Sequence, residues 1–221
     1  MARYLVTGAN RGLGLEYCRQ LKNRGEEVIA VCRDISLELK RMGVRIESGL
    51  DYLNPRMPME LAQRLGGIAL DGVILNAGML KTIPFDALDL DSIRLQFEVN
   101  ALAPLVLTHV LVDQMPEGSK LVLMTSRMGS IEDNTSGGSY GYRMSKAALN
   151  SAGKSLAHDL HERGIAVAVL HPGLVSTNMT RFNPNGINPV DAVKGLLARI
   201  DSLTLQNSGT FWHANGTVLP W

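Results

Sequence analysis

Short apolar runs alternate along the chain with longer amphipathic stretches. Runs of consecutive apolar residues are typical of strands buried on both faces of a sheet, and they stand at residues 3–6, 28–31, 44–46, 72–75, 120–124 and 165–170. The segments between them predict helices at 12–24, 36–42, 57–65, 89–115, 141–163 and 188–201. Because strands and helices alternate, the pattern predicts an α/β fold with a doubly wound parallel sheet and helices on both faces.

The pattern contains no repeat or linker that would divide the chain, so residues 1–221 are expected to form a single domain. Two irregular stretches, 129–139 and 176–187, each follow a predicted strand. Ligands of doubly wound sheets bind at the carboxyl ends of the strands. We therefore expect these two stretches to be small substrate loops.

Composition narrows the classes of partner. Hydrophobic residues make up 45% and charged residues 19% of the 221 residues, which is ordinary for a globular protein. The 22 basic and 21 acidic residues leave a net charge of +1, so no basic surface for nucleic acid or an anionic membrane is expected. The apolar stretch 101–112 is about half a membrane span and contains Pro104. The sequence predicts no nucleic-acid partner and no membrane partner.

Cysteine and histidine usage points to a reducing compartment and to no metal. Cys18 and Cys32 are too few for a disulfide framework, and neither stands in a spacing that holds a metal. The five histidines do not form a site either. Thr7, Gly8 and Asn10 interrupt the apolar start that a signal peptide would need. We expect a cytoplasmic protein without a metal site.

A glycine-rich turn joins the first predicted strand to the first helix. It has the spacing Thr7-Gly8-x-x-x-Gly12-x-Gly14. Glycine permits a positive φ, and the missing side chain lets main-chain N–H groups approach a pyrophosphate at the positive end of the helix. The turn therefore indicates a dinucleotide site, with a tight strand-to-helix connection as the plain structural alternative.

This spacing resembles the signature of the short-chain dehydrogenase/reductase family, and further motifs follow in the family's order. They are Leu75-Asn76-Ala77-Gly78 after the fourth strand, Asn100 in the long helix, Ser126 after the fifth strand, Tyr142-x-x-x-Lys146, and Pro172-Gly173-x-Val175-x-Thr177 after the sixth strand. Residues 8–16, 31–34, 142–150 and the C-terminal segment look closest to the C-factor and Sniffer-like carbonyl reductase branch. The resemblance covers residues 7–177 and implies a Rossmann fold that binds a nicotinamide cofactor.

The candidate catalytic residues lie in the later motifs. Tyr142 and Lys146 are four apart on a predicted helix and share one face, and a nearby ammonium favours the phenolate of a tyrosine, whose reference pKa is about 10. The resemblance implies that Tyr142 protonates a substrate carbonyl and that Lys146 also holds the nicotinamide ribose. It further implies that Ser126 binds the substrate oxygen and that Asn100 positions a water in the proton relay. Ser130 stays an alternative to Ser126, and a core amide stays an alternative role for Asn100.

The end of the second predicted strand indicates which cofactor binds. In the family an acidic residue that selects NAD would fall at Cys32, and an arginine that selects NADP would fall at Arg33. Arg11 is a second basic residue near the expected 2′-phosphate, and ordinary surface charges are the alternative for both arginines. Asp51 looks like the family's adenine contact, or is a turn residue. The sequence predicts NADP(H) as the cofactor.

The full set of residues that the resemblance implies for cofactor binding spans four motifs and two single residues. It comprises Gly8, Asn10, Arg11, Gly12, Leu13, Gly14, Arg33, Asp51, Asn76, Ala77, Gly78, Tyr142, Lys146, Pro172, Gly173, Val175 and Thr177.

The resemblance implies an NADPH-dependent carbonyl reductase that acts on a small-molecule aldehyde or ketone. The alternative is a dinucleotide-binding signalling or regulatory protein of the C-factor type with little turnover. Because one nucleotide-binding fold uses nearly the whole chain, specificity is expected in the two loops and in the tail from Phe211 onward. A homodimer or homotetramer is expected through the two long helices at 89–115 and 141–163.

Overall fold

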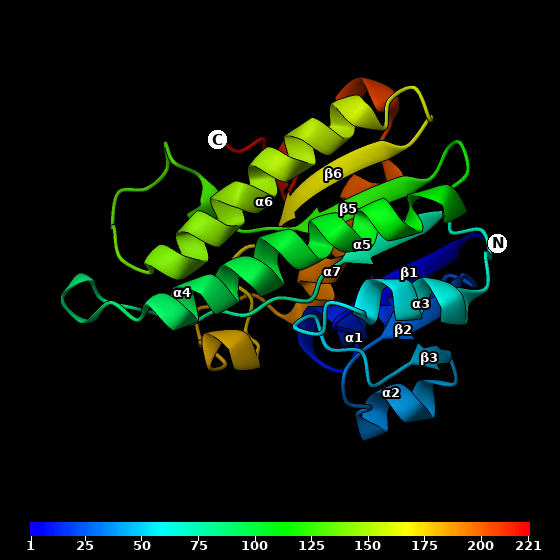
Figure 1. Cartoon of the computed structure of the whole chain (residues 1–221), viewed down its shortest axis with the longest axis horizontal. Coiled ribbons are helices and arrows are strands. Elements are labelled where there is room, and N and C mark those ends of the chain that lie inside the picture. The colour runs from blue at the N-terminus through cyan, green and yellow to red at the C-terminus, as the bar shows by residue number, and fades with distance from the viewer.

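The computed structural model describes residues 1–221 and contains a single seven-stranded parallel sheet with the strand order β3-β2-β1-β4-β5-β6-β7 (Figure 1). The strands are β1 (Arg3–Thr7), β2 (Glu27–Val31), β3 (Arg45–Glu47), β4 (Gly72–Leu75), β5 (Lys120–Met124), β6 (Ala166–His171) and β7 (Thr210–His213). The predicted single-domain Rossmann fold, a doubly wound parallel α/β sheet, is confirmed. The six predicted strands all form, each with its ends within a residue of the prediction.

The seventh strand corrects the prediction that the whole tail from Phe211 onward determines substrate specificity. In β7, Phe211 pairs with Val169 of β6 and is fully buried in the sheet. The four-residue segment has one polar residue at each end, so its apolar run is too short to stand out in the sequence. Phe211 and Trp212 therefore belong to the core, and only the residues after them lie near the loops.

The helices are α1 (Gly12–Asn23), α2 (Leu37–Met42), α3 (Met57–Leu65), α4 (Leu90–Phe97), α5 (Ala103–Leu111), α6 (Tyr140–Asp159) and α7 (Pro189–Asp201). The predicted helix at 89–115 is interrupted by a π-helical turn, Glu98–Leu102, that joins α4 to α5. Pro104 has no N–H to donate to the carbonyl of Asn100 four residues earlier, which weakens the α pattern at this point. The predicted helix at 141–163 ends earlier, at Asp159.

The helical segment Leu90–Gln114 is long and apolar enough to cross a membrane by length and composition alone. Half of its most apolar window is buried inside the protein, where α5 packs against α3 and α4 packs against α6. This burial is what a core helix of a parallel sheet requires, because both faces of such a sheet must be covered.

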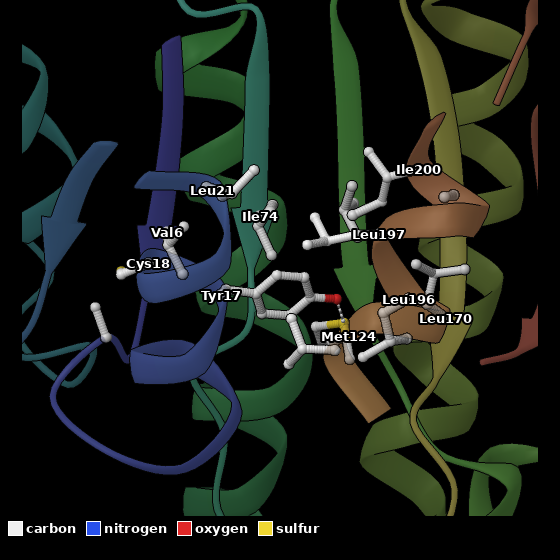
Figure 2. Packing of buried hydrophobic residues seen from close by; sticks show 14 of the residues in the cluster. Val6, Tyr17, Cys18, Leu21, Ile74, Met124, Leu170, Leu196, Leu197 and Ile200 are labelled. Atoms are coloured by element: carbon white, nitrogen blue, oxygen red, sulfur yellow. Dashed lines mark hydrogen bonds between the residues drawn. The ribbon is translucent and has the colours of Figure 1, made fainter. Parts of the chain in front are cut away.

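The core has two layers, one on each face of the sheet. On one face α1 and α7 cover the strands, and the fully buried Tyr17 of α1 donates a hydrogen bond from its hydroxyl to Sδ of Met124 at 3.4 Å (Figure 2). On the other face α3, α5 and α6 pack over Leu5, Val73 and Leu121. Both faces of the central strands are apolar, which explains why these strands are near-continuous hydrophobic runs in the sequence.

The carboxyl ends of the strands lie at one edge of the sheet. The register pairs Val6 with Ile74, Ile74 with Val122, and Val122 with Ala168. The loops that follow β4, β5 and β6 extend beyond this edge (Figure 1). The predicted motifs therefore come together where ligands of such sheets bind.

Candidate active site

The glycine-rich turn after β1 is packed too closely to accept side chains. Gly8 has φ +65°, and a Cβ built there would lie 2.9 Å from Cα of Ala77. A Cβ on Gly14 would lie 2.2 Å from the carbonyl oxygen of Gly8 and 2.7 Å from Nδ2 of Asn76. Glycine is thus required at both positions, which brings α1, β1 and the Asn76–Gly78 segment into direct contact.

Hydrogen bonds between Asn76, Ala77 and Thr7 hold this turn against the segment that follows β4. The Thr7 hydroxyl accepts hydrogen bonds from the main-chain N–H of Asn76 at 3.0 Å and of Ala77 at 3.1 Å. The Asn76 amide donates to the carbonyl of Thr7 at 3.0 Å. The structure brings Asn76 to the predicted cofactor turn as a residue that supports its backbone.

The N-terminus of α1 is open toward a cavity. Arg11 is the N-cap residue, its side chain makes no capping hydrogen bond, and the first turn carries no acidic residue. A Cβ on Gly12 would touch only the Thr177 side chain, at 3.7 Å. A cavity of about 410 Å³ borders Arg11, Gly12 and Thr177. Free N–H groups at a helix N-terminus, beside open space, fit the pyrophosphate of a dinucleotide.

Arg33 and Asp51 lie side by side beyond the ends of β2 and β3. Nε of Arg33 is 3.0 Å from Oδ2 of Asp34, and Nη1 of Arg33 is 3.5 Å from Oδ2 of Asp51. The Arg33 side chain is 67% exposed. The predicted phosphate contact and the predicted adenine contact therefore share one place in the fold, and Arg33 is accessible to an anion from solvent.

Tyr142 and Lys146 lie on α6 and are both buried, at 7% and 5% exposure. Nζ of Lys146 is 5.9 Å from the centre of the Tyr142 ring and donates a hydrogen bond to the carbonyl of Met124 at 2.8 Å. Burial raises the pKa of the Tyr142 phenol, and a hydrogen bond with the Ser126 side chain acts in the opposite direction. Burial lowers the pKa of Lys146 to about 8. At neutral pH Lys146 thus keeps a positive charge beside the phenol.

Asn100 lies in the π-helical turn and is completely buried. Its Oδ1 accepts from the N–H of Met79 at 2.9 Å, and its Nδ2 donates to the carbonyl of Met79 at 2.9 Å and to Oγ of Ser145 at 3.0 Å. A Cβ on Gly78 would lie 3.1 Å from Oδ1 of Asn100 and 3.6 Å from Nζ of Lys146. The side chain of Asn100 therefore holds the loop after β4 against Lys146.

Ser126 and Ser130, the two candidate serines, have different partners. Ser126 caps the short 3-10 turn Arg127–Gly129 and accepts a hydrogen bond from the N–H of Met128 at 3.1 Å. The Ser130 hydroxyl donates to the main-chain oxygen of Trp221 at 3.0 Å and accepts from the N–H of Asp133 at 3.1 Å. Ser126 faces Tyr142, whereas Ser130 faces the C-terminal segment.

The second predicted substrate loop, 176–187, is closed at its neck. Val175 forms a parallel bridge with Ile187, and the N–H of Ser176 donates to the carbonyl of Ile187 at 3.0 Å. Upstream, Gly173 of the Pro172-Gly173 turn has φ +88°. This neck places Thr177 opposite Gly12. The loop after β6 is thereby held next to the open end of α1.

Several residues of this region have no counterpart among the predicted site residues. Gly129 packs so closely on α6 that a built Cβ would lie 2.7 Å from the carbonyl carbon of Lys146. Thr125 donates from Oγ1 to Oδ1 of Asn150 at 2.6 Å. Asn150 stands one helical turn after Lys146, a spacing that the sequence displays. Nothing in the sequence marks Gly129, because its role depends on the approach of two distant segments.

His171 and His213 end β6 and β7 with their rings in contact. Their ring centroids are 5.0 Å apart in an edge-on arrangement. Burial lowers the pKa of His171 to about 3, so this imidazole is neutral at pH 7. The sequence pattern does not predict this contact, because the apolar run of β7 is too short to stand out as a strand.

The chain is similar to curated proteins over most or all of its length. It is 42% identical over 226 residues to 1-hydroxy-2-glutathionyl-2-methyl-3-butene dehydrogenase of Rhodococcus sp., covering all of both chains. It is 44% identical over 128 residues to C-signal of Myxococcus xanthus, which covers 57% of this chain and 76% of that protein.

Solved structures resemble the fold over its whole length. NADPH-bound carbonyl reductase from chicken fatty liver matches with a TM-score of 0.90 and 27% identity, over 100% of this chain and 99% of the other. Carbonyl reductase Sniffer of D. melanogaster matches with a TM-score of 0.89 and 27% identity over all of both chains. The expected similarity to C-factor and Sniffer-like proteins is confirmed.

The family profile agrees with these similarities. The profile described as short chain dehydrogenase matches residues 56–187, which is more than half of the chain. The protein therefore belongs to the short-chain dehydrogenase family.

Proposed function

We propose that this oxidoreductase uses NADP(H) and reduces the carbonyl group of a small-molecule aldehyde or ketone to an alcohol. The observation that carries the proposal is the packing of Tyr142, Lys146 and Ser126 together at the carboxyl edge of the sheet. The similarity to carbonyl reductases, one of them with NADPH bound, supports the choice of reaction and cofactor.

Tyr142 is proposed as the general acid. Bound NADPH would supply the hydride to the carbonyl carbon. Tyr142 would give its proton to the carbonyl oxygen, and the Lys146 ammonium would stabilise the resulting phenolate. The Ser126 hydroxyl would donate a hydrogen bond to the same oxygen and stabilise charge that develops there. Ser126 is preferred to Ser130 because the hydroxyl of Ser130 is already engaged with Trp221.

Asn100 is proposed to act through its main-chain carbonyl. Its side chain is fully engaged with Met79 and Ser145, so it is the core amide that the sequence also allowed. Pro104 has no N–H to donate to the Asn100 carbonyl in the α pattern, so this carbonyl would accept from a water on the path to Lys146.

The cofactor would lie along the carboxyl edge, with its pyrophosphate at the N-terminus of α1. Gly8, Gly12 and Gly14 shape that turn, Asn76 supports it, and we assign Asn10, Leu13, Ala77 and Gly78 to its walls. Pro172, Gly173, Val175 and Thr177 would border the nicotinamide end. Arg33 and Arg11 would bind the 2′-phosphate, because exposed guanidinium groups form strong hydrogen bonds with phosphate. Asp51, which lies beside Arg33, would border the adenine.

The proposal is tested by NADPH oxidation with a panel of aldehydes, ketones and quinones, and by NADP⁺ reduction with a glutathionyl alcohol suggested by the relative from Rhodococcus. Tyr142→Phe keeps the ring and removes the proton, so the rate should fall by about 1,000-fold. NADPH affinity should stay within about threefold, since the phenol hydroxyl makes only part of the cofactor contacts.

Equal rates in wild type and Tyr142→Phe would contradict the assignment of Tyr142. The alternative, a regulatory dinucleotide-binding protein, predicts cofactor binding without turnover of any panel compound. The similarity to C-signal is the observation behind this alternative, and the complete Tyr142, Lys146 and Ser126 set argues against it.

We also propose that copies of the chain associate through α4, α5 and α6 as a homodimer or homotetramer. Exposed apolar side chains mark this face, namely Leu95, Leu102, Leu105, Val106 and Met144. Light scattering after size exclusion would measure the mass. Leu102→Glu combined with Val106→Glu should give monomers, whereas Leu53→Glu, at an exposed site elsewhere, should leave the mass unchanged.

A further inference from the structure

The loop that follows Ser126 is attached to the C-terminal segment by one acceptor atom. The main-chain oxygen of Trp221 accepts hydrogen bonds from the N–H groups of Ile131 and Glu132, both at 2.9 Å, and from the Ser130 hydroxyl at 3.0 Å. Ser130 is 2% exposed, so its hydroxyl has no solvent to replace this partner. Both N–H groups and the hydroxyl depend on the position of Trp221.

The C-terminal segment is itself fixed to the core. The N–H of Leu219 donates to the carbonyl of Phe211 at 2.8 Å, and Val218 forms an antiparallel bridge with Trp212. The Trp221 ring stacks on Phe211 with centroids 5.4 Å apart. Because Phe211 is a buried residue of β7, the stacked ring places the Trp221 oxygen at a defined point relative to the sheet.

The anchored loop leads directly to the proposed catalytic residues. The N–H of Ser130 donates to the carbonyl of Arg127 at 3.0 Å, and that of Gly129 donates to the carbonyl of Ser126 at 2.8 Å. Gly129 packs on the backbone of Lys146. The anchor at 130–132 is therefore four to six residues from Ser126 along a chain of short, consecutive hydrogen bonds.

The loop's other attachments do not replace this anchor. Arg127 pairs with Asp133 at 2.5 Å, but its side chain is largely exposed and such a pair stabilises weakly. Arg143 of α6 donates to the hydroxyl of Ser136 at 2.8 Å and the carbonyl of Gly137 at 3.2 Å in the far part of the loop, and at 3.4 Å to the carbonyl of Met128, which precedes residues 130–132. Among these contacts, the Trp221 oxygen alone holds residues 130–132.

We propose that Trp221 is a positioning residue that holds the loop 127–133, and through it the Ser126 hydroxyl, in the arrangement that binds the substrate carbonyl. The inference rests on the proposed function, because it needs Ser126 to contact the substrate. Trp221 touches neither substrate nor cofactor; it acts through Ser130 and the N–H groups of Ile131 and Glu132.

The test compares Trp221→Ala with Trp221→Phe and with Val218→Ala, whose side chain is exposed in the same segment. Losing the stacked ring frees the Trp221 oxygen. In Trp221→Ala, amide hydrogen exchange in 130–132 should speed up by at least about tenfold, and kcat/KM for the carbonyl should fall by about tenfold, mainly through KM. The Kd of NADPH should stay within about twofold, because the glycine turn follows β1, which β4 separates from β5 and this loop.

Trp221→Phe keeps an aromatic ring on Phe211 and should recover most of the lost kcat/KM, and Val218→Ala should behave as wild type. Ser130→Ala removes one of the three donors and should change KM in the same direction. Combining it with Trp221→Ala should add little, because both act through one contact.

Two results would overturn the positioning role in an active enzyme. One is an unchanged KM in Trp221→Ala. The other is an equal loss of NADPH affinity that Trp221→Phe does not recover, which would indicate general destabilisation. Wild-type protein without turnover of any carbonyl compound would instead overturn the proposed function, and this inference with it.

Discussion

The two halves of the sheet hold their functional groups in different ways. In the half formed by β1 to β3, the turn is shaped by glycines and the charged candidates are exposed, as in Arg33 at 67%. In the half formed by β5 to β7 with α6, the functional side chains are buried, and burial changes the pKa of both Tyr142 and Lys146. One half therefore presents main-chain groups and exposed charges, and the other presents buried side chains in a low-dielectric setting.

This difference has energetic consequences. Exposed charges contribute little to the stability of the protein until a bound ligand removes water from them. Buried ionisable groups lower the stability of the free protein, and they occur where catalysis needs a shifted pKa. Substitutions in the first half should therefore change backbone packing and cofactor choice. Substitutions in the second half should change how the stability of the protein depends on pH.

The largest effect is expected where the first half depends on shape. In Gly14→Ala the new Cβ meets the carbonyl oxygen of Gly8, a backbone atom that cannot move alone. The free energy of unfolding should fall by about 3 kcal/mol or more, and NADPH binding should be lost. Urea denaturation and calorimetric titration would measure both.

The matched control is Gly12→Ala. Its Cβ has room, so it should lose only about 1–2 kcal/mol for the positive φ of +55°. Equal losses of unfolding free energy in Gly14→Ala and Gly12→Ala would contradict the argument from close packing.

The second effect tests the burial of Lys146. Its pKa is lowered from 10.5 in the unfolded chain to about 8 in the folded protein, so between these pH values the unfolded state binds more protons. Stability should therefore rise with pH across that window, by up to about 3 kcal/mol in total. Below about pH 8 the buried ammonium destabilises the fold by the full amount.

Lys146→Met removes this titration. The difference in unfolding free energy between the variant and wild type should shrink as pH rises from 8 to 10, while carbonyl reduction is lost at every pH. A difference that is independent of pH, measured by urea denaturation at each pH, would show that burial does not shift this pKa.

A smaller effect is expected for Arg33→Ala. Loss of a charge-assisted contact to the 2′-phosphate should weaken NADPH binding by about 30-fold and leave NADH binding within about twofold. Fluorescence titration with both cofactors would measure the ratio. Arg45→Ala, which removes another surface guanidinium of the same half, should change neither, and equal losses for NADPH and NADH in Arg33→Ala would remove the phosphate assignment.

The smallest effect is expected for Asp34→Asn. Asp34 pairs with Arg33 where both side chains are largely exposed, and it would compete with the phosphate for the same guanidinium. Removing its charge should tighten NADPH binding by about two- to threefold, less at high salt. Weaker binding of NADPH in this variant would indicate that Asp34 orients Arg33 instead.

Most of the fold could be predicted because its causes are local. Six strands are apolar runs long enough to stand out, and the glycine spacing of 8, 12 and 14 marks a strand-to-helix turn in the sequence, although the contacts of Gly8 with Ala77 and of Gly14 with Asn76 are visible only in the fold. The seventh strand could not, because Thr210–His213 owes its place to pairing with β6. The π-helical turn could not be predicted either, because Pro104 indicates only that the α pattern is weakened near Asn100 and does not specify which hydrogen bonds replace it.

The candidate site divides in the same way. Tyr142 and Lys146 could be paired from their helical spacing. The choice between Ser126 and Ser130 could not be made, because it depends on a tryptophan 91 residues away from Ser130. Likewise, Gly129 matters only because its segment lies against α6.

Met124 has a consequence for anyone who redesigns this enzyme. Its sulfur lies in the apolar layer under α1, where the Tyr17 hydroxyl binds it (Figure 2), while its carbonyl oxygen accepts from the Lys146 ammonium on the opposite side. A repacked core beneath α1 would tilt the end of β5 and carry that carbonyl with it. Libraries that vary core residues such as Tyr17 for thermal stability therefore also vary the support of the candidate active site at this strand, and should be screened for turnover as well as for melting temperature.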